Sequence, residues 1–149
     1  MSISKIKNSI ITKNLINRGF TDLSDIQKKI LDVYQNKQDL LVTSQTGSGK
    51  TIAYFLSIQN EISLKKIKDN SSPSVLIVAP TRELAIQVYE EACWVFNGED
   101  IDIITTIGGM DIKKERKKLL NKFSLLIGTP DHPRASRLER QPRVDLRSG

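Results

Sequence analysis

The sequence has few of the residues that point to a secreted protein, a membrane protein or a metal-binding protein. Its 149 residues include one cysteine, Cys93, and one histidine, so it cannot form an internal disulfide or a cysteine–histidine metal site. No apolar run approaches the roughly 18 residues needed to span a bilayer. The amphipathic N-terminus shows no signal-peptide core or cleavage site. We therefore expect a cytoplasmic protein with no membrane partner.

The residues that are present suit one globular domain with a basic surface. Apolar residues make up 38% of the sequence and charged residues 27%, which argues against a wholly disordered chain. The length is sufficient to bury a real core. The net charge of +6 permits nucleic-acid binding but does not establish it.

The composition changes abruptly near residue 131. Residues 132–149 are rich in arginine and contain no isoleucine, lysine or asparagine, which are abundant before them. This segment could be a basic arm that binds RNA phosphates, but the abrupt change favours a tail of different coding origin, such as a frameshifted end. We expect residues 1–131 to form a partial domain and residues 132–149 to be a disordered basic tail.

Helix-like and strand-like segments alternate along residues 1–131. The pattern predicts helices over 8–18, 26–36, 49–67, 82–96 and 111–120, and buried strands over 39–43, 75–79, 101–107 and 124–127. Continuous apolar strands between helices indicate an α/β fold, with a mostly parallel sheet and helices on both faces. In the helix over 82–96 we expect Leu84 and Ala85 to face the core and Cys93 to be a packed thiol.

A glycine-rich turn between the first predicted strand and the third predicted helix matches the phosphate loop of nucleotide-binding proteins. Its glycines permit a tight turn whose N–H groups converge on phosphate oxygens, and the following helix adds its positive dipole end. Lys50 would neutralise β- and γ-phosphate charge, and the Thr51 hydroxyl would ligate Mg²⁺. The alternative is an ordinary turn with a surface lysine. The predicted ATP-binding loop consists of Ser44, Gln45, Thr46, Gly47, Ser48, Gly49, Lys50 and Thr51.

Four further motifs occur in a characteristic order around this loop. They are Gly19-Phe20 with Ile26-Gln27, Pro80-Thr81-Arg82-Glu83-Leu84-Ala85, Gly108-Gly109, and Thr129-Pro130. Together with the loop they resemble the DEAD-box ATP-dependent RNA helicases, over about residues 3–131. The resemblance implies an incomplete RecA-like P-loop NTPase domain that uses ATP and Mg²⁺ and has RNA as its partner.

The resemblance also implies roles for individual residues. Phe20 and Gln27 belong to the adenine-reading motif, in which the Gln27 carboxamide would bind the adenine edge. The RNA path would be lined by Pro80, Thr81, Arg82, Gly108, Gly109 and Thr129. The chain departs from the family pattern at Ile10 (usually aromatic), Leu23 (usually proline), Ser44 (usually alanine) and His132 (usually arginine).

Several parts that the family uses for ATP hydrolysis are missing from the 149 residues. The sequence contains neither an Asp-Glu-Ala-Asp motif nor a Ser-Ala-Thr motif, and it has no second RecA-like domain. We therefore expect a truncated helicase piece that binds ATP and RNA, with Lys50 the one catalytic residue retained, and that does not hydrolyse ATP alone. Two alternatives stay open: a non-catalytic remnant or decoy that binds RNA or a helicase partner, and a different P-loop NTPase or kinase. Residues 39–43 would form an unprotected sheet edge, which predicts association with itself or with a complementing helicase fragment.

Overall fold

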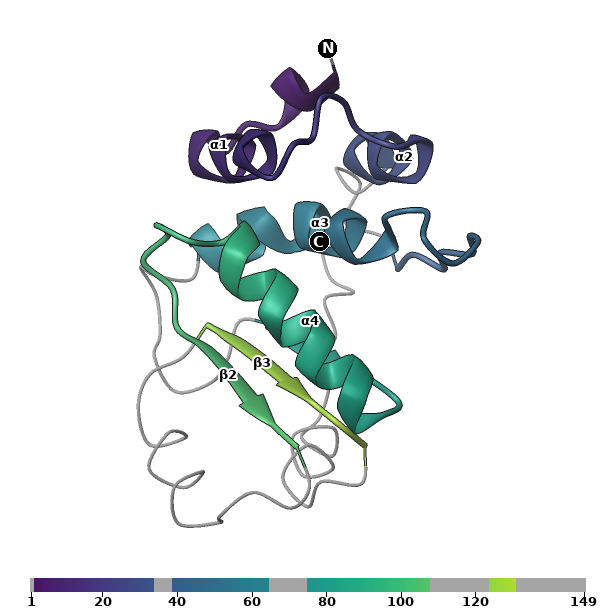
Figure 1. Ribbon diagram of the computed structural model, residues 1–149, viewed down its shortest axis with the longest axis vertical. Helices are drawn as coiled ribbons and strands as arrows, with labels where there is room; N and C mark the ends of the chain where they lie inside the picture. Colours follow the sequence, from purple (N-terminus) through teal and green to yellow (C-terminus); the bar gives the residue numbers. More distant parts are fainter. Residues whose placement is uncertain (1, 34–38, 65–74, 108–123, 131–149) are drawn as a thin grey trace, which may run out of the picture. The chain divides into compact units, whose positions relative to one another are not determined.

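The computed structural model describes residues 2–33, 39–64, 75–107 and 124–130 (Figure 1). These residues fall into two compact units. The first comprises Met1–Asp69 with Glu90–Ile101, and the second comprises Asn70–Tyr89 with Asp102–Gly149. The predicted basic helix over 111–120, the glycines at 108 and 109 and the tail over 132–149 lie outside the described residues.

The first unit is helical, and local chemistry sets both ends of its helix α1. After the short 3-10 helix η1 (Ser2–Lys5), α1 (Ser9–Asn17) begins at Asn8, whose Oδ1 accepts hydrogen bonds from two backbone N–H groups of the first turn. Gly19, with φ +89°, follows its end. The sequence prediction of this helix is confirmed.

The core of the first unit lies among α1, α2 (Asp25–Val33), α3 (Lys50–Leu64) and the end of α4 (Arg82–Val95). Helix α2 packs against α3 (Figure 1). The Phe55 and Phe96 rings meet edge to face, with centroids 5.5 Å apart. The largest buried side chains here include Ile11, Leu15, Phe55, Leu56 and Val95.

The second unit contains a parallel three-stranded sheet made of β1 (Val75–Val78), β2 (Ile103–Thr106) and β3 (Leu125–Gly128). The order is β1-β3-β2, so the last strand along the chain is the central one. Figure 1 shows β2 and β3 running in the same direction. All four residues of β3 are buried, as expected for the central strand of a parallel sheet. The predicted parallel α/β architecture is confirmed.

The structure corrects one predicted strand. Residues 39–43 were expected to form a buried strand, but they have no strand conformation and Leu41 is 97% exposed. The structure shows no hydrogen bond between these residues and the rest of the described chain. An apolar run becomes a strand only when a neighbouring strand can satisfy its N–H and C=O groups, and the sheet order includes no such neighbour for this segment.

Two side chains of α4 also differ from the sequence prediction. Leu84 is 39% exposed and Cys93 is exposed, whereas both were expected to pack inside. The buried stripe of α4 consists of Ala85, Val88, Ala92 and Val95. Leu84 and Cys93 each adjoin a member of this stripe in sequence, and one residue is a rotation of about 100° around the helix, which turns them off the buried face.

Candidate functional site

The glycine-rich loop leads directly into the N-terminus of α3. A turn at residues 46 and 47 precedes a bend, and α3 begins at Lys50. Gly47 has φ +79° and Gly49 has φ +86°, values that side-chain-bearing residues rarely adopt. A glycine-containing turn that delivers the chain to a helix N-terminus is the arrangement that binds phosphate groups in proteins.

The Lys50 side chain folds back over this loop. Its Nζ donates hydrogen bonds to the backbone oxygens of Ser44 and Gln45, the second at 3.3 Å. An ammonium group has three donors, so two anchor the side chain to the loop and a third is left for an anion. Thr51 occupies the first turn of α3 with a half-exposed side chain. Lysine and threonine therefore lie side by side in sequence at the end of the loop, as the predicted Mg²⁺–phosphate site requires.

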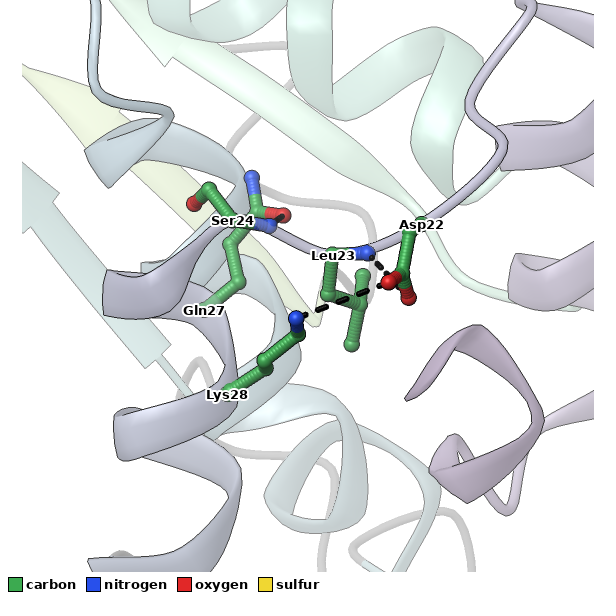
Figure 2. A network of polar contacts seen from close by, with 5 residues as sticks. All are labelled: Asp22, Leu23, Ser24, Gln27 and Lys28. Atoms are coloured by element: carbon green, nitrogen blue, oxygen red, sulfur yellow. Dashed lines mark hydrogen bonds and ion pairs between the residues drawn. The ribbon is translucent and has the colours of Figure 1, made fainter. Parts of the chain in front are cut away.

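The loop is held from behind by the start of α2. The Ser24 Oγ donates to the Ser48 carbonyl oxygen at 2.9 Å, and the Gln27 Nε2 donates to the Gly49 oxygen at 3.2 Å. The Gln27 Oε1 accepts from the Ser24 backbone N–H at 2.9 Å, which Figure 2 shows as a dashed line. The pair Ser24 and Gln27 is thus half of a capping box whose remaining groups bind the phosphate loop.

Gln27 is almost fully buried in this arrangement, at 2% exposure. A carboxamide has two N–H donors and two oxygen lone pairs, and one of each is already used by Gly49 and Ser24. One N–H and one oxygen lone pair of Gln27 therefore have no hydrogen-bond partner among the described residues. The backbone of Gly49 passes so close that a Cβ there would lie 2.4 Å from the Gln27 Nε2.

Leu23, which stands where the resembled family usually has proline, is integrated into the same turn. Its N–H donates to Asp22 Oδ1 at 3.0 Å, a bond that proline could not make. Asp22 also pairs with Lys28 at 3.5 Å (Figure 2). The Leu23 side chain is 4% exposed. This departure from the family pattern therefore stabilises the turn through an N–H bond and apolar burial.

Phe20 lies next to the last turn of α4. Its ring centroid is 6.2 Å from that of Trp94, and the Arg18 guanidinium lies 4.7 Å above the Trp94 ring. The Asn14 Nδ2 donates to the oxygens of Val95 at 2.9 Å and Asn97 at 2.8 Å. The segment that carries Phe20 is therefore fastened to the C-terminal end of α4.

The predicted RNA-contacting residues that the structure describes lie in the second unit, after two adjacent parallel strands. Val78 of β1 is level with Gly128 of β3, so Pro80 and Thr129 follow their strands at the same edge of the sheet. Pro80, Thr81 and Arg82 are exposed, whereas Thr129 is 3% exposed. The Thr81 Oγ1 accepts from the Leu84 N–H at 3.2 Å and so caps α4.

The first unit thus brings together Gln27 and the phosphate loop, and the second unit brings together the residues after β1 and β3. Sequence reasoning missed Ser24, although the spacing Ser24-x-x-Gln27 is a capping-box pattern that could have identified it. In the described part of the chain no group of three or more histidine, cysteine, aspartate or glutamate side chains could hold a metal ion. Within the same residues no helix has the length and apolarity to cross a membrane.

The family model for the DEAD/DEAH box helicases matches residues 24–144. The chain belongs to the DEAD/DEAH box helicase family. Among its relatives, ATP-dependent RNA helicase DBP4 of Meyerozyma guilliermondii is 36% identical over 135 residues, which are 87% of this DEAD-box chain and 18% of that protein. DEAD-box ATP-dependent RNA helicase CshB of Bacillus subtilis is 41% identical over 115 residues, 75% of this chain and 25% of that protein. The chain therefore spans about a fifth to a quarter of these two helicases.

A solved helicase structure has the same fold as this DEAD-box chain. The DEAD-box helicase Mss116 bound to ssRNA and UDP-BeF aligns with a TM-score of 0.80 at 23% sequence identity. The alignment covers 94% of this chain and 30% of that one. The predicted family and the predicted RecA-like fold class are both confirmed.

Proposed function

We propose that this chain binds ATP with Mg²⁺ through the loop over residues 44–51 and selects adenine through Gln27 and Phe20. The observation that carries the proposal is the bonding of Gln27 to the loop: its Nε2 donates to Gly49, next to Lys50. A side chain that contacts the phosphate loop while keeping one donor and one acceptor is suited to link adenine and phosphate recognition. Thr51 would hold Mg²⁺, which would neutralise phosphate charge.

We further propose that single-stranded RNA binds beside the carboxyl ends of β1 and β3. Pro80, Thr81 and Arg82 are exposed there, and Arg82 opens α4, where a cation is opposed by the helix dipole unless it has an anionic partner. A phosphate group supplies that partner. Gly108, Gly109 and Thr129 complete the proposed RNA set. The RNA and ATP partners of the helicase relatives suit both proposals.

The chain by itself is proposed to bind without turnover. Phosphoryl transfer depends on positioning and on neutralising charge, and the family's acidic motif is absent from the 149 residues. Lys50 and Thr51 can bind phosphate and metal but cannot position an attacking water by themselves. The non-catalytic alternative, in which the chain binds RNA or a helicase partner, involves the same residues.

Calorimetric titration of the purified chain with MgATP tests the proposed nucleotide site. We expect binding weaker than micromolar, because Mg²⁺ coordination is incomplete and Ile10 offers no aromatic face to adenine. Lys50→Ala should abolish it, whereas Lys29→Ala, an exposed lysine of α2, should leave it unchanged. Phosphate release with and without single-stranded RNA should stay at the level of the Lys50→Ala protein. Tight binding that survives Lys50→Ala would refute the site, and turnover that Lys50→Ala removes would refute the absence of hydrolysis.

A further inference from the structure

Two serine hydroxyls bridge the phosphate loop. The Ser44 Oγ lies 2.6 Å from the Ser48 Oγ, a hydrogen-bonding distance for two hydroxyls. Ser44 is the first residue of the loop, and Ser48 lies just before the glycine that leads into α3. The resembled family usually has alanine at position 44, which cannot form such a bridge. The bridge is therefore a feature of this chain's own sequence.

Ser48 is connected to three other residues. Besides the bridge to Ser44, its carbonyl oxygen accepts from the Ser24 Oγ at 2.9 Å, and its N–H donates to the Gln45 oxygen at 3.3 Å. Through these bonds Ser48 links the capping box of α2 to the loop. The hydroxyl bridge extends that link to Ser44, whose backbone oxygen accepts a hydrogen bond from the Lys50 ammonium.

We propose that Ser44 is a positioning residue for the polyphosphate part of the nucleotide, acting through Ser48 and Lys50. This inference rests on the proposed nucleotide site and adds a residue to it. The bridge joins the first residue of the loop to Ser48, so the backbone between these two residues is ordered before a phosphate arrives. A site ordered in advance loses less conformational freedom on binding.

The bridge also leaves one hydroxyl hydrogen of the pair for a ligand. Two hydroxyls have two hydrogens, and one of them is used between the oxygens. The other is available to a phosphate oxygen, since both side chains are partly accessible to solvent. Replacing Ser44 by alanine removes one hydroxyl and leaves the Ser48 hydroxyl free to rotate. The loss of one ordered hydrogen bond should weaken nucleotide binding by about threefold to tenfold.

Titration with MgADP and with tripolyphosphate tests this inference in the intact chain. Ser44→Ala should weaken both ligands by a similar factor, because the bridge acts on the phosphate part. Ser44→Thr keeps the hydroxyl and should restore binding. The double variant Ser44→Ala/Ser48→Ala should bind no more weakly than either single variant, since both changes break the same bridge. Ser57→Ala is the matched control, because the Ser57 hydroxyl also bonds within its own element, to the Tyr54 oxygen of α3 at 2.6 Å.

The outcomes of these titrations distinguish the role of Ser44 from the proposed nucleotide site on which it rests. Ser44→Ala that binds as tightly as the unaltered chain, while Lys50→Ala binds nothing, would overturn the role of Ser44 and leave the nucleotide site standing. Equal losses for Ser44→Ala and Ser44→Thr, or strictly additive losses in the double variant, would also overturn it. No binding of MgADP or tripolyphosphate by the unaltered chain would overturn both. Thermal melts of every variant show whether a loss of binding comes from unfolding.

Discussion

Gly47 and Gly49 have the same unusual backbone conformation but different neighbours. A side chain at either position is strained by the positive φ, at a cost of about 1–2 kcal/mol. A Cβ at Gly47 would meet nothing within 4 Å, whereas one at Gly49 would lie 2.4 Å from the Gln27 Nε2. Gly49→Ala must therefore also displace the Gln27 carboxamide, the group that bonds the loop and Ser24.

This contrast gives a paired prediction. Both Gly47→Ala and Gly49→Ala should lower the free energy of unfolding, measured by urea denaturation. Gly49→Ala should lower it by about 1 kcal/mol more than Gly47→Ala, because it disturbs the hydrogen bonds of Gln27. Selectivity for ATP over GTP should fall in Gly49→Ala and stay unchanged in Gly47→Ala. Equal stability and equal selectivity in the two variants would show that Gln27 is not held against Gly49.

At the residue scale, sequence reasoning predicted the glycines, Lys50 and Gln27 because the motif fixes their types and order. It did not predict which atoms Gln27 bonds in the folded chain, since that depends on how α2 meets the loop. The hydroxyl bridge between Ser44 and Ser48 could not be predicted from the sequence either. A serine in place of the usual alanine is visible in the sequence, but its partner is not.

Among the elements, α1 and α4 are joined by asparagine side chains. Asn14 donates to the carbonyl oxygen of Val95, the last residue of α4, and to that of Asn97 just beyond it. Asn8 bonds Glu99, just beyond that end. The helix that carries the proposed RNA residues at its start is therefore fixed at its other end by the N-terminal segment.

Asn14→Ala should destabilise the chain by about 1–2 kcal/mol, because two carbonyl oxygens lose their donor. Asn17→Ala changes an exposed asparagine at the end of the same helix and should have a much smaller effect. Urea denaturation followed by circular dichroism measures both. Similar unfolding free energies for the two variants would mean that water replaces the Asn14 amide without loss.

A second prediction at this scale concerns Glu91 in α4, whose carboxyl group has a raised pKa because burial disfavours its charged form. A carboxyl whose pKa is higher in the folded than in the unfolded chain contributes stability at low pH, and this stability is lost as the pH rises through the folded pKa. Glu91→Gln should therefore melt at a higher temperature than the unaltered chain at neutral pH, with the difference shrinking at about pH 4. The exposed neighbour Glu90 provides the control variant, Glu90→Gln.

Helix α1 was predictable as an element because apolar residues that recur with a helical period, a capping residue and a closing glycine all occur within one segment. The expected helix over 8–18 is α1 (Ser9–Asn17). The strand expected over 39–43 was wrong for the complementary reason. A strand is stable only in a sheet, so its existence depends on residues elsewhere in the chain. The exposure of Leu84 and Cys93 shows that element type is easier to predict than the direction in which each side chain points.

For the molecule as a whole, we expect the exposed segment over 39–43 to cause association with other chains. Leu41 is 97% exposed, and the described chain offers this segment no hydrogen-bond partner. An exposed apolar segment whose backbone N–H and C=O groups are unpaired is a template for strand addition. The added strand can come from a second copy or from a complementing helicase fragment. The same feature predicts a low, broad thermal transition for the chain alone.

Analytical ultracentrifugation should show self-association of the unaltered chain that Leu41→Pro reduces, because proline removes an N–H donor and a long apolar side chain. Ile16→Lys is the control, because Ile16 is also an exposed apolar residue, at 54%, but lies within the helix α1. Proline is not used at this position because it would break the helix. We expect Ile16→Lys to associate like the unaltered chain. A monomeric unaltered chain with a sharp melt at high temperature would show that the segment needs no partner.

The strand order β1-β3-β2 has a consequence for how the protein is made. Among the described residues, both outer strands pair with β3 alone, and β3 follows β1 by about fifty residues. On the ribosome, β1 and β2 therefore emerge before β3, their partner in the described sheet, and this sheet assembles only after residue 128 has left the exit tunnel. Pairings between segments so distant in sequence form slowly, because a long loop must close first. The helices of the first unit, up to α3, are complete well before that moment. A nascent chain of this protein thus passes through a stage in which the loop over residues 44–51 and the segment of α3 have been synthesised, while β1 and β2 still await β3.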